Sequence, residues 1–418
     1  MSSIPSIKQF FKKPYFILFS MFYFIIPLVH SSNTNELFEF PKMFWVYFFS
    51  LFLSAFFISD FVIKKFKLSK VPLQVVFFTF AFLISTLAST HLYTSVWGYY
   101  TRFNGGLISL IAYFIIYYVG ICKFSLEEVE NIFKFSMFSL IPVGILGILQ
   151  YYGIGVFSAV RVYSTFGQPN WLAQFLGINL LFSLFYFFKE KKPLYLVLYI
   201  VGFCCLWLTF SLSGLFGFLA GLIALIIFFI KDKKWHDIKN RFALIVSISL
   251  LIGGLNPGLY KPKILDIFTD FKKIGKSFFI THAQDQNLVS DPGYIRLGLW
   301  KGSVNLAFSS LRNILIGTGP ETFPYAFQQF RPLSLNYSSE WDYVFNKPHN
   351  YYLEILCEQG LLGAVSYVFL MIYLFKKLPR KYIPGLICFL TTNIFGWPVV
   401  SVSMIFWLFL ITAKVYEK

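Results

Sequence analysis

The sequence predicts an all-α, polytopic membrane protein with about twelve transmembrane helices and one long, partly helical extracytoplasmic loop. Three observations lead to this fold class. The 418 residues are 57% hydrophobic and 13% charged, whereas soluble domains average about 25% charged residues. Apolar runs long enough to cross a bilayer recur along the chain. The Lys and Arg residues gather in the short segments between alternate runs.

A run of roughly 17–25 apolar residues crosses the hydrocarbon layer of about 30 Å. Candidate runs, several of them short, lie near residues 14–30, 43–63, 71–90, 105–122, 135–152, 170–188, 194–210, 214–230, 242–256, 358–375, 382–395 and 397–413. We therefore divide the chain into three parts. Residues 1–256 form a membrane domain with about nine helices, residues 257–350 form an extracytoplasmic loop subdomain, and residues 351–418 add about three C-terminal membrane helices.

The formal net charge of +17 reports orientation in the membrane. With the N-terminus inside, about two thirds of the Lys and Arg residues fall in the inside segments, as the positive-inside rule requires. Both termini are therefore expected on the cytoplasmic side of the cytoplasmic membrane, and the loop at 257–350 on the outer side. The same distribution argues against a nucleic-acid partner, because the positive charge is spread over short segments that flank membrane spans.

Cysteine and histidine positions predict neither a disulfide framework nor a metal centre. The five cysteines lie in or beside apolar runs without paired spacing, which is typical of small core residues. The histidines other than His349 are scattered over both faces, so we expect no metal ligands and no cofactor. The chain also lacks a Gly-x-Ser-x-Gly elbow, and no Gly-Lys-Ser/Thr follows Gly317 and Gly319.

The long outer loop is expected to contain helices. Residues 291–310 place Ile295, Leu299 and Trp300 near helical spacing, which predicts an amphipathic helix lying along the bilayer or over a cavity. Residues 317–330 read as a glycine turn, Pro320 at a helix start, and a short helix.

Three outer arginines lie at conspicuous positions. Arg102 precedes Asn104 and two glycines at the outer end of the fourth span, Arg161 opens the segment 161–176, and Arg296 lies in the amphipathic loop helix. A guanidinium binds a diphosphate with its planar fork and needs no metal to do so. The alternative is that each is an interface arginine that binds lipid headgroups.

His349 stands where the long loop returns to an apolar span, in the segment 348–363. An imidazole at this place is suited to move a proton. Its alternative is a plain helix start, with Asn350 as the N-cap. Glu354 follows on the same helical stripe as Asn350, and Tyr352 suits either an interface belt or a sugar-stacking platform.

These residues resemble the superfamily of O-antigen ligases and O-antigen polymerases, bacterial envelope enzymes that include protein O-oligosaccharyltransferases. The resemblance spans about residue 97 to residue 376. Its motifs are His349-Asn350 with Leu353-Glu354 and the glycines Gly360 and Gly363; Arg161 with Phe166-Gly167-Gln168-Pro169-Asn170; and Arg296 with Trp300 and the turn at 317–320. The set occurs in the family's order and on the expected side of the membrane.

The resemblance implies a metal-independent, inverting glycosyl transfer without a cofactor. The donor would be a glycan on an undecaprenyl diphosphate carrier, and the acceptor a hydroxyl of a lipid-anchored sugar, another glycan or a protein. His349, Arg161 and Arg296 would be catalytic, with His349 as the base. Substrate-binding roles would fall to Arg102, Gln168, Asn170, Ser213, Trp300, Asn350, Tyr352 and Glu354.

One departure from the family concerns the tight outer turn before residue 214. The family commonly has Ser-Arg-Gly there, whereas this chain has Ser211-Leu212-Ser213-Gly214. Either the two serines suffice, or Arg102 supplies the charge, or the donor is held differently. A ligase is favoured over a polymerase or a protein oligosaccharyltransferase. The rivals from other classes are a transporter or flippase of lipid-linked glycans and a non-catalytic membrane scaffold.

Overall fold

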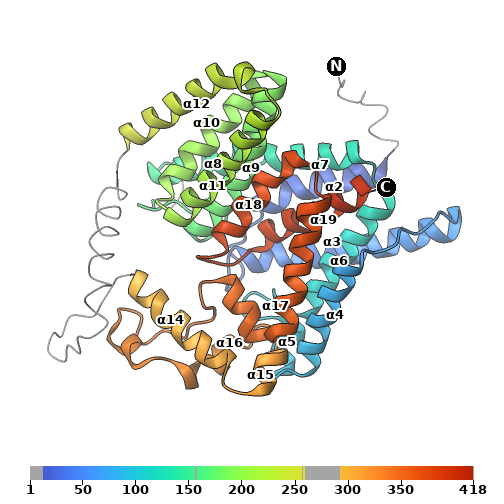
Figure 1. The fold of residues 1–418 in the computed structure, drawn as a ribbon, viewed down its shortest axis with the longest axis vertical. Helices are drawn as coiled ribbons and strands as arrows, with labels where there is room; N and C mark the ends of the chain where they lie inside the picture. The colour runs from blue at the N-terminus through green and yellow to red at the C-terminus, as the bar shows by residue number, and fades with distance from the viewer. Residues whose placement is uncertain (1–12, 156–157, 257, 259–291, 418) are drawn as a thin grey trace.

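The computed structural model describes residues 13–155, 158–256, 258 and 292–417, and these residues form a bundle of helices (Figure 1). Most of the segment 257–291, including the first residue of the helix predicted at 291–310, lies outside the described residues. The longer helices are α2 (Pro14–Ile25), α3 (Glu39–Lys64), α4 (Leu73–Leu87), α6 (Leu107–Lys123), α7 (Leu126–Phe138), α8 (Leu140–Tyr151), α9 (Pro169–Glu190), α10 (Pro193–Leu208), α11 (Leu212–Lys231), α12 (Trp235–Leu255), α14 (Pro292–Ala307), α17 (Tyr351–Lys377), α18 (Ile383–Thr392) and α19 (Val400–Glu417). The short elements are η1 (Ile26–Leu28), α5 (Leu92–Trp97), α15 (Leu311–Ile316), α16 (Phe323–Ala326), η3 (Phe327–Phe330), η4 (Leu333–Tyr337) and η5 (Arg380–Tyr382).

Every predicted apolar run coincides with a helix, but the runs differ in length. Within the described residues, 7 helices are long and apolar enough to cross a membrane: α3, α7 together with α8, α9, α11, α12, α17 and α19. Shorter apolar helices occupy Pro14–Leu28, Leu73–Leu87, Leu107–Lys123 and Pro193–Leu208. The structure therefore confirms an all-helical membrane protein, while the count of about twelve spans is not confirmed.

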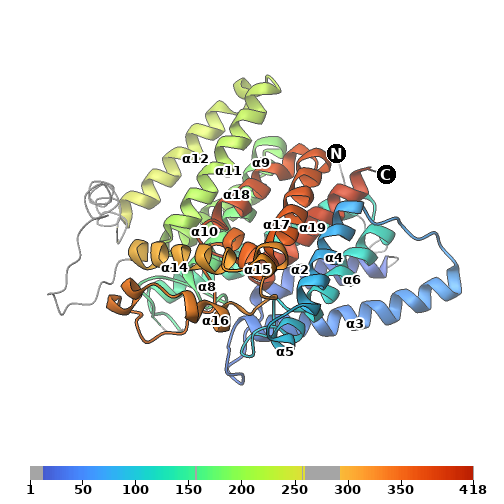
Figure 2. The same cartoon turned by 60° about the horizontal axis from the view of Figure 1, so that its bottom comes forward.

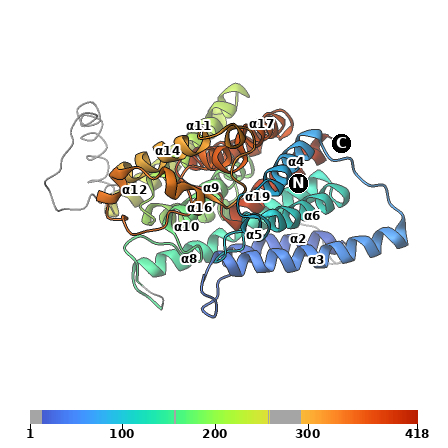
Figure 3. The same ribbon diagram turned by 90° about the horizontal axis from the view of Figure 1, so that it is seen from below.

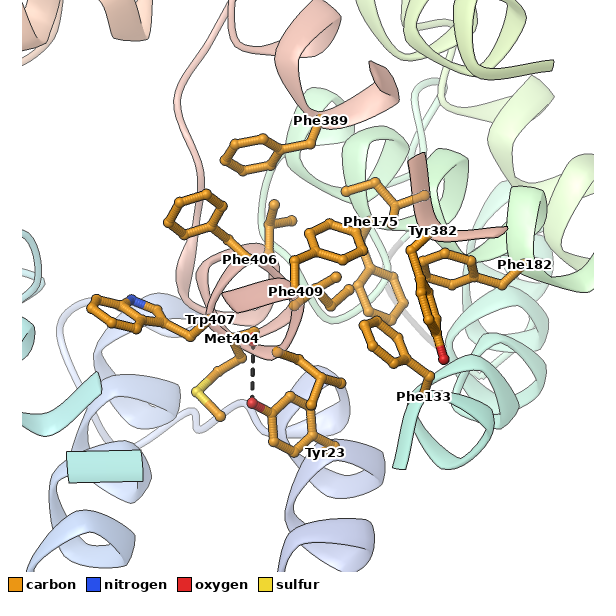
Figure 4. Packing of buried hydrophobic residues seen from close by; sticks show 14 of the residues in the cluster. Tyr23, Phe133, Phe175, Phe182, Tyr382, Phe389, Met404, Phe406, Trp407 and Phe409 are labelled. Atoms are coloured by element: carbon orange, nitrogen blue, oxygen red, sulfur yellow. Dashed lines mark hydrogen bonds between the residues drawn. The ribbon is translucent and has the colours of Figure 1, made fainter. Parts of the chain in front are cut away.

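Aromatic side chains hold the centre of the bundle together (Figure 4). The ring of Phe133 on α7 lies 4.5 Å from that of Tyr382 and 5.6 Å from that of Phe409 on α19. The hydroxyl of Tyr23 on α2 donates to the carbonyl oxygen of Met404 at 3.2 Å. Almost every side chain of α9 is buried. Because α9 and α19 lie inside the bundle, residues at their ends can be held rigidly.

At the periphery of the bundle, large apolar side chains are exposed rather than buried. α3 runs along one edge of the molecule beside α6 (Figure 3). Its large apolar side chains Phe44, Trp45 and Phe48 are exposed, as expected for side chains that face lipid rather than protein.

Ion pairs join helix ends at one end of the bundle. Lys123 at the end of α6 pairs with Asp60 on α3 at 2.5 Å, and Lys381 in η5 pairs with Glu130 on α7. These are segments that the charge pattern assigns to the same side of the membrane. The helix α7 also begins earlier than predicted, because Ser125 and Glu128 form a capping box that starts the helix within polar sequence.

The loop residues 292–350 form a small unit with its own core beside α17 (Figures 1 and 2). Ile295 and Leu299 of α14 pack with Phe323 and Phe327 of α16 and η3. The predicted amphipathic helix is therefore α14, and both α14 and α15 contact α17.

The helix α17 is kinked at Gly360, whose φ of 62° and ψ of −162° are not helical. The kink leaves two carbonyl groups without their intrahelical donors. The backbone N–H of Thr318 donates to the carbonyl of Cys357 at 3.0 Å, and that of Gly319 donates to the carbonyl of Glu358 at 2.8 Å. A Cβ at Gly360 would lie 2.5 Å from the backbone nitrogen of Ile316. The glycine thus lets the loop unit dock onto the helix.

Candidate active site

Two neighbouring cavities lie where the loop unit meets the bundle. The larger, of about 130 Å³, is lined by Arg102, Glu354 and Trp397 among others. The smaller, of about 10 Å³, is lined by Gln168, Asn170, Trp171, Gln174, Ser213, His349, Thr392, Phe395, Gly396 and Trp397. Trp397 belongs to the non-helical segment 393–399 between α18 and α19. Its indole lines both cavities.

His349 is half-buried at the end of the loop unit, and its ring centroid lies 5.2 Å from that of Trp397. Neither ring nitrogen has a hydrogen-bond partner in the part of the chain that the structure describes. Its backbone has a φ of 54°, a left-handed conformation that costs about 1–3 kcal/mol and is often found at functional sites. The imidazole is therefore presented with both nitrogens available.

The surroundings of His349 keep its imidazole neutral. Burial, and then the positive charges of Arg296 and Arg102, lower the pKa of His349 from 6.5 to about 4. A neutral imidazole has one nitrogen that accepts a proton. The two arginines lie close enough to act on it, although they come from α14 and from the turn before α6.

Arg102 is held by aromatic rings and not by acceptors. Its guanidinium carbon lies 5.1 Å from the centre of the Trp171 ring and 5.8 Å from that of Trp397. The guanidinium makes no hydrogen bond and no ion pair within residues 13–155, 158–256, 258 and 292–417. The next residue, Phe103, has a φ of 49° and accepts a hydrogen bond from the Tyr47 hydroxyl at 2.5 Å, which fixes the turn.

Arg161, Asn170 and two serines form a polar cluster at the N-terminal ends of α9 and α11. Arg161 donates from Nη2 to Oδ1 of Asn170 at 3.3 Å and from Nε to the carbonyl of Thr209 at 3.2 Å. The hydroxyl of Ser211 donates to the same Asn170 oxygen at 2.7 Å and lies 3.1 Å from that of Ser213. A guanidinium is therefore present beside the turn where Leu212 stands.

Gln168 directly precedes α9, and its Oε1 is buried without a hydrogen-bond partner among the described residues. It lines the small cavity with His349. Since a buried polar atom is normally paired, this oxygen marks a place where a ligand or water donates.

The residues after His349 serve first to start α17. The side chain of Asn350 accepts from the backbone N–H of Tyr352 at 3.0 Å and of Leu353 at 3.1 Å, which confirms the predicted N-cap. Tyr352 donates its hydroxyl to the carbonyl of Leu390 at 2.6 Å, and it lines neither cavity. Glu354 lines the larger cavity but pairs with Lys347 and not with His349.

The two predicted site residues of α14, Arg296 and Trp300, have different environments. Arg296 acts electrostatically on His349. Trp300 packs against the core of the loop unit and lines neither cavity.

Sequence reasoning missed Lys347, Glu321 and Trp397. Lys347 is buried and donates to Glu321 at 2.5 Å and to Glu354 at 2.6 Å. Burial alone lowers the pKa of Lys347, but Glu321, Glu354 and Glu358 raise it above its ordinary value. The signals were charged residues beside the two motifs already singled out, Glu321 after Pro320 and Lys347 before Pro348. For Trp397 the signal was an aromatic residue between Gly396 and Pro398.

The fold is that of a polytopic helical membrane protein. Arginines, an imidazole and tryptophans lie around the two cavities where the loop unit meets the bundle. Residues 195–368 match the family described as O-antigen ligase, which confirms the resemblance drawn from the motifs. The match indicates a glycan-transferring membrane enzyme of the ligase or polymerase type. It includes Ser213, Arg296 and His349, while Arg102, Arg161 and Asn170 precede it. No curated protein and no solved structure matches the chain.

Proposed function

We propose that this protein transfers a glycan from an undecaprenyl diphosphate carrier to the hydroxyl of a lipid-anchored sugar, at the outer face of the bacterial cytoplasmic membrane. One observation carries the proposal. The Arg102 guanidinium lies against two tryptophans that contact each other, without a protein acceptor among the described residues, next to a histidine with both ring nitrogens available. An unpaired cation and a free base side by side are suited to an anionic leaving group and a hydroxyl nucleophile.

Arginines provide the donor side of the proposed site. Arg102 would bind the diphosphate through its free N–H groups, and Arg161 and Arg296 would add positive charge. Arg161 stands beside the turn at Leu212, which supports the idea that it supplies the charge that the family places in that turn. Charge-assisted hydrogen bonds to a diphosphate neutralise the leaving group without a metal ion.

The proposed reaction is a single displacement. The acceptor oxygen forms a bond to the anomeric carbon of the donor sugar, and the bond from that carbon to the diphosphate oxygen breaks. The diphosphate leaves with the electron pair, and the acceptor proton moves to His349. The bound diphosphate would raise the pKa of the imidazole, because its negative charge offsets the arginines that lower it.

The sidedness of the site is part of the proposal. The ion-paired end of the bundle carries the Lys residues at the ends of α3, α6 and α17, which the positive-inside rule assigns to the cytoplasm. Both termini would then be cytoplasmic, and the cavities would open toward the outer side.

The test is transfer by the purified protein from a lipid-diphosphate-linked glycan to a panel of acceptors. His349→Ala should abolish transfer while leaving donor binding intact, and full transfer by this variant would remove its assignment as the base. Arg161→Ala combined with Arg296→Ala should weaken donor binding. The acceptor that is used decides between ligase, polymerase and protein oligosaccharyltransferase. Transbilayer movement of the donor without transfer would favour a transporter.

A further inference from the structure

The larger cavity is lined by buried oxygen atoms that have no hydrogen-bond partner among the described residues. Glu39, Glu354 and Gln359 are 2%, 7% and 6% exposed, and all three line the cavity. One side-chain oxygen of each has no hydrogen-bond partner within that part of the chain: Oε1 of Glu39, Oε2 of Glu354 and Oε1 of Gln359. The Glu39 oxygen has the Lys42 ammonium 3.7 Å away, beyond hydrogen-bond distance. Leaving a buried acceptor unpaired is costly, so these oxygens indicate a bound group that donates hydrogen bonds.

The acidic side chains in the interior of the cavity disfavour an anion among them, so a diphosphate bound to Arg102 would lie outside this group of side chains. The carboxylates are those of Glu39, Glu321, Glu354 and Glu358, and the cations beside them are Arg102, Lys347 and Lys42. Lys347 is already shared by two carboxylates, and both oxygens of Glu358 accept backbone N–H groups. A diphosphate pushed into this cavity would meet uncompensated carboxylate oxygens.

A metal ion does not suit the cavity either. No group of three or more His, Cys, Asp and Glu side chains is arranged to hold a metal ion in the part of the chain that the structure covers. The remaining ligand class is a neutral molecule with several hydroxyl donors. Aromatic side chains, among them Tyr113, Trp397 and Trp407, form much of the wall and offer flat apolar faces to the ring of such a molecule.

The volume of the cavity suits a small ligand. Its volume is about 130 Å³, well above the ~10–15 Å³ that a single water molecule needs by the same kind of measure. Sites for drug-sized ligands measure about 300–1,000 Å³. A single sugar residue, not an extended glycan, is therefore the matching occupant.

We propose that this cavity binds one sugar residue of a substrate, through hydroxyl groups that donate to Glu39, Glu354 and Gln359. The inference rests on the proposed glycan transfer and deepens it. Arg102 and Trp397 line the cavity and also lie next to His349, so a sugar held there would lie beside the reacting groups. The residue is either the first sugar of the donor or the terminal sugar of the acceptor.

The test uses Gln359→Met in the full-length protein, which keeps the side-chain volume and removes the acceptor. KM is measured with the donor varied and then with the acceptor varied. Losing one hydrogen bond to the sugar should raise one KM about two- to tenfold and leave the other unchanged. A raised acceptor KM identifies the acceptor sugar, and a raised donor KM identifies the donor sugar. Wild-type values for both would mean that the cavity holds only water, and would overturn the proposal.

One control variant and one alternative test variant accompany Gln359→Met. Gln328→Met changes an exposed glutamine outside both cavities and should leave both KM values unchanged. Glu39→Gln changes a second acceptor on a different helix, and it replaces Gln359→Met if that variant does not fold.

A binding readout separates this inference from the proposed function. Methyl glycosides should raise the thermal unfolding midpoint of the wild type more than that of Gln359→Met at the same concentration. If the wild type transfers no glycan but shows this shift, the sugar site stands and the proposed transfer fails. If the wild type transfers glycan and the variants match it in KM and in thermal shift, the sugar site fails alone.

Discussion

The protonation of His349, the proposed base, depends on its burial and on two neighbouring arginines. Because its pKa is about 4, the free enzyme keeps a neutral imidazole well below neutral pH. We expect kcat/KM to lose no activity through this group between pH 8 and pH 5, since that ratio reports the pKa values of the free enzyme. The folded state should lose stability as the pH falls from about 6.5 to about 4, because the unfolded chain binds the proton more readily.

Arg296→Gln should move the acid limb of this profile upward. Without the positive charge of Arg296, the pKa of His349 rises toward 6.5, and kcat/KM should fall within the range where the wild type is flat. The measured quantity is the pH at which kcat/KM begins to fall, not the plateau value of kcat/KM. Weaker donor binding in the variant lowers the plateau and therefore does not obscure the shift. An unchanged limb would show that Arg296 does not act on the base.

A substitution at Arg102 can show whether the planar guanidinium is needed or only its positive charge. Arg102→Lys retains the charge but loses the flat group that lies against Trp171 and Trp397 and the paired donors. A lost charge-assisted hydrogen bond costs about 1.5–3 kcal/mol, so kcat/KM for the donor should fall by about ten- to a hundredfold.

The matched control for Arg102 is Arg380→Lys. Arg380 is exposed and pairs with Asp232 at 3.2 Å, and neither residue lines a cavity. This variant should keep wild-type kcat/KM. Equal losses in the two variants would mean that the Arg102 effect is not specific to the site.

The candidate site was only partly predictable at the level of residues. His349, Arg161, Asn170 and Ser213 stand out because they are polar residues beside turns, and the structure brings them around one small cavity or its rim. Trp397 does not stand out, because tryptophan is also common where membrane helices end. Trp397 lines both cavities only because of the path that the chain takes between α18 and α19.

At the level of elements, the kink of α17 depends on one glycine. Gly360 has a φ of 62° and a ψ of −162°, a region almost restricted to glycine, and its close neighbour is the backbone of Ile316. Gly360→Ala should therefore lower the free energy of unfolding by at least about 1–3 kcal/mol. The measurement is the thermal unfolding midpoint in detergent.

Gly254→Ala is the matched control for this kink. Gly254 is helical in α12, and a Cβ added to it would meet no described atom within 4 Å. Alanine should be neutral or slightly stabilising there, because glycine is about 1 kcal/mol worse than alanine inside a helix. Similar losses in both variants would contradict the special role of the kink.

Helix boundaries were predictable where apolar periodicity decides them and not where capping decides them. The run predicted from residue 135 belongs to a helical segment that begins at Leu126, because the capping box of Ser125 and Glu128 starts the helix in polar sequence. The kink at Gly360 could not be read from the sequence, since it requires the loop at 317–319 to contribute donors from outside the helix.

At the level of the whole molecule, the orientation in the membrane can be tested with a matched pair of exposed lysines. Lys301 lies on α14 and Lys376 near the end of α17. In intact cells, a membrane-impermeant thiol reagent should label Lys301→Cys and should label Lys376→Cys only after permeabilisation. The wild-type chain gives the background from its native cysteines. The reverse pattern would invert the proposed topology.

The fold class followed from composition and charge, because apolar runs between Lys-rich segments leave few alternatives to a helical membrane protein. The number of membrane spans could not be predicted from composition and charge. α18 has 10 residues and α4 has 15, and such helices satisfy a hydropathy pattern without reaching the length of a full crossing. Whether a short helix crosses depends on its tilt and neighbours, which hydropathy does not record.

The non-helical segment 393–399 contains a cavity-lining position that is free of close packing contacts. Gly396 lies in this segment and lines the small cavity with His349. A Cβ added there would meet only the carbonyl oxygen of Thr392 among the described residues, at 3.9 Å. Any larger side chain at this position would narrow the space in front of the imidazole without disturbing a helix. In the proposed site, the size of this one residue would limit what approaches the imidazole, at little cost to the fold.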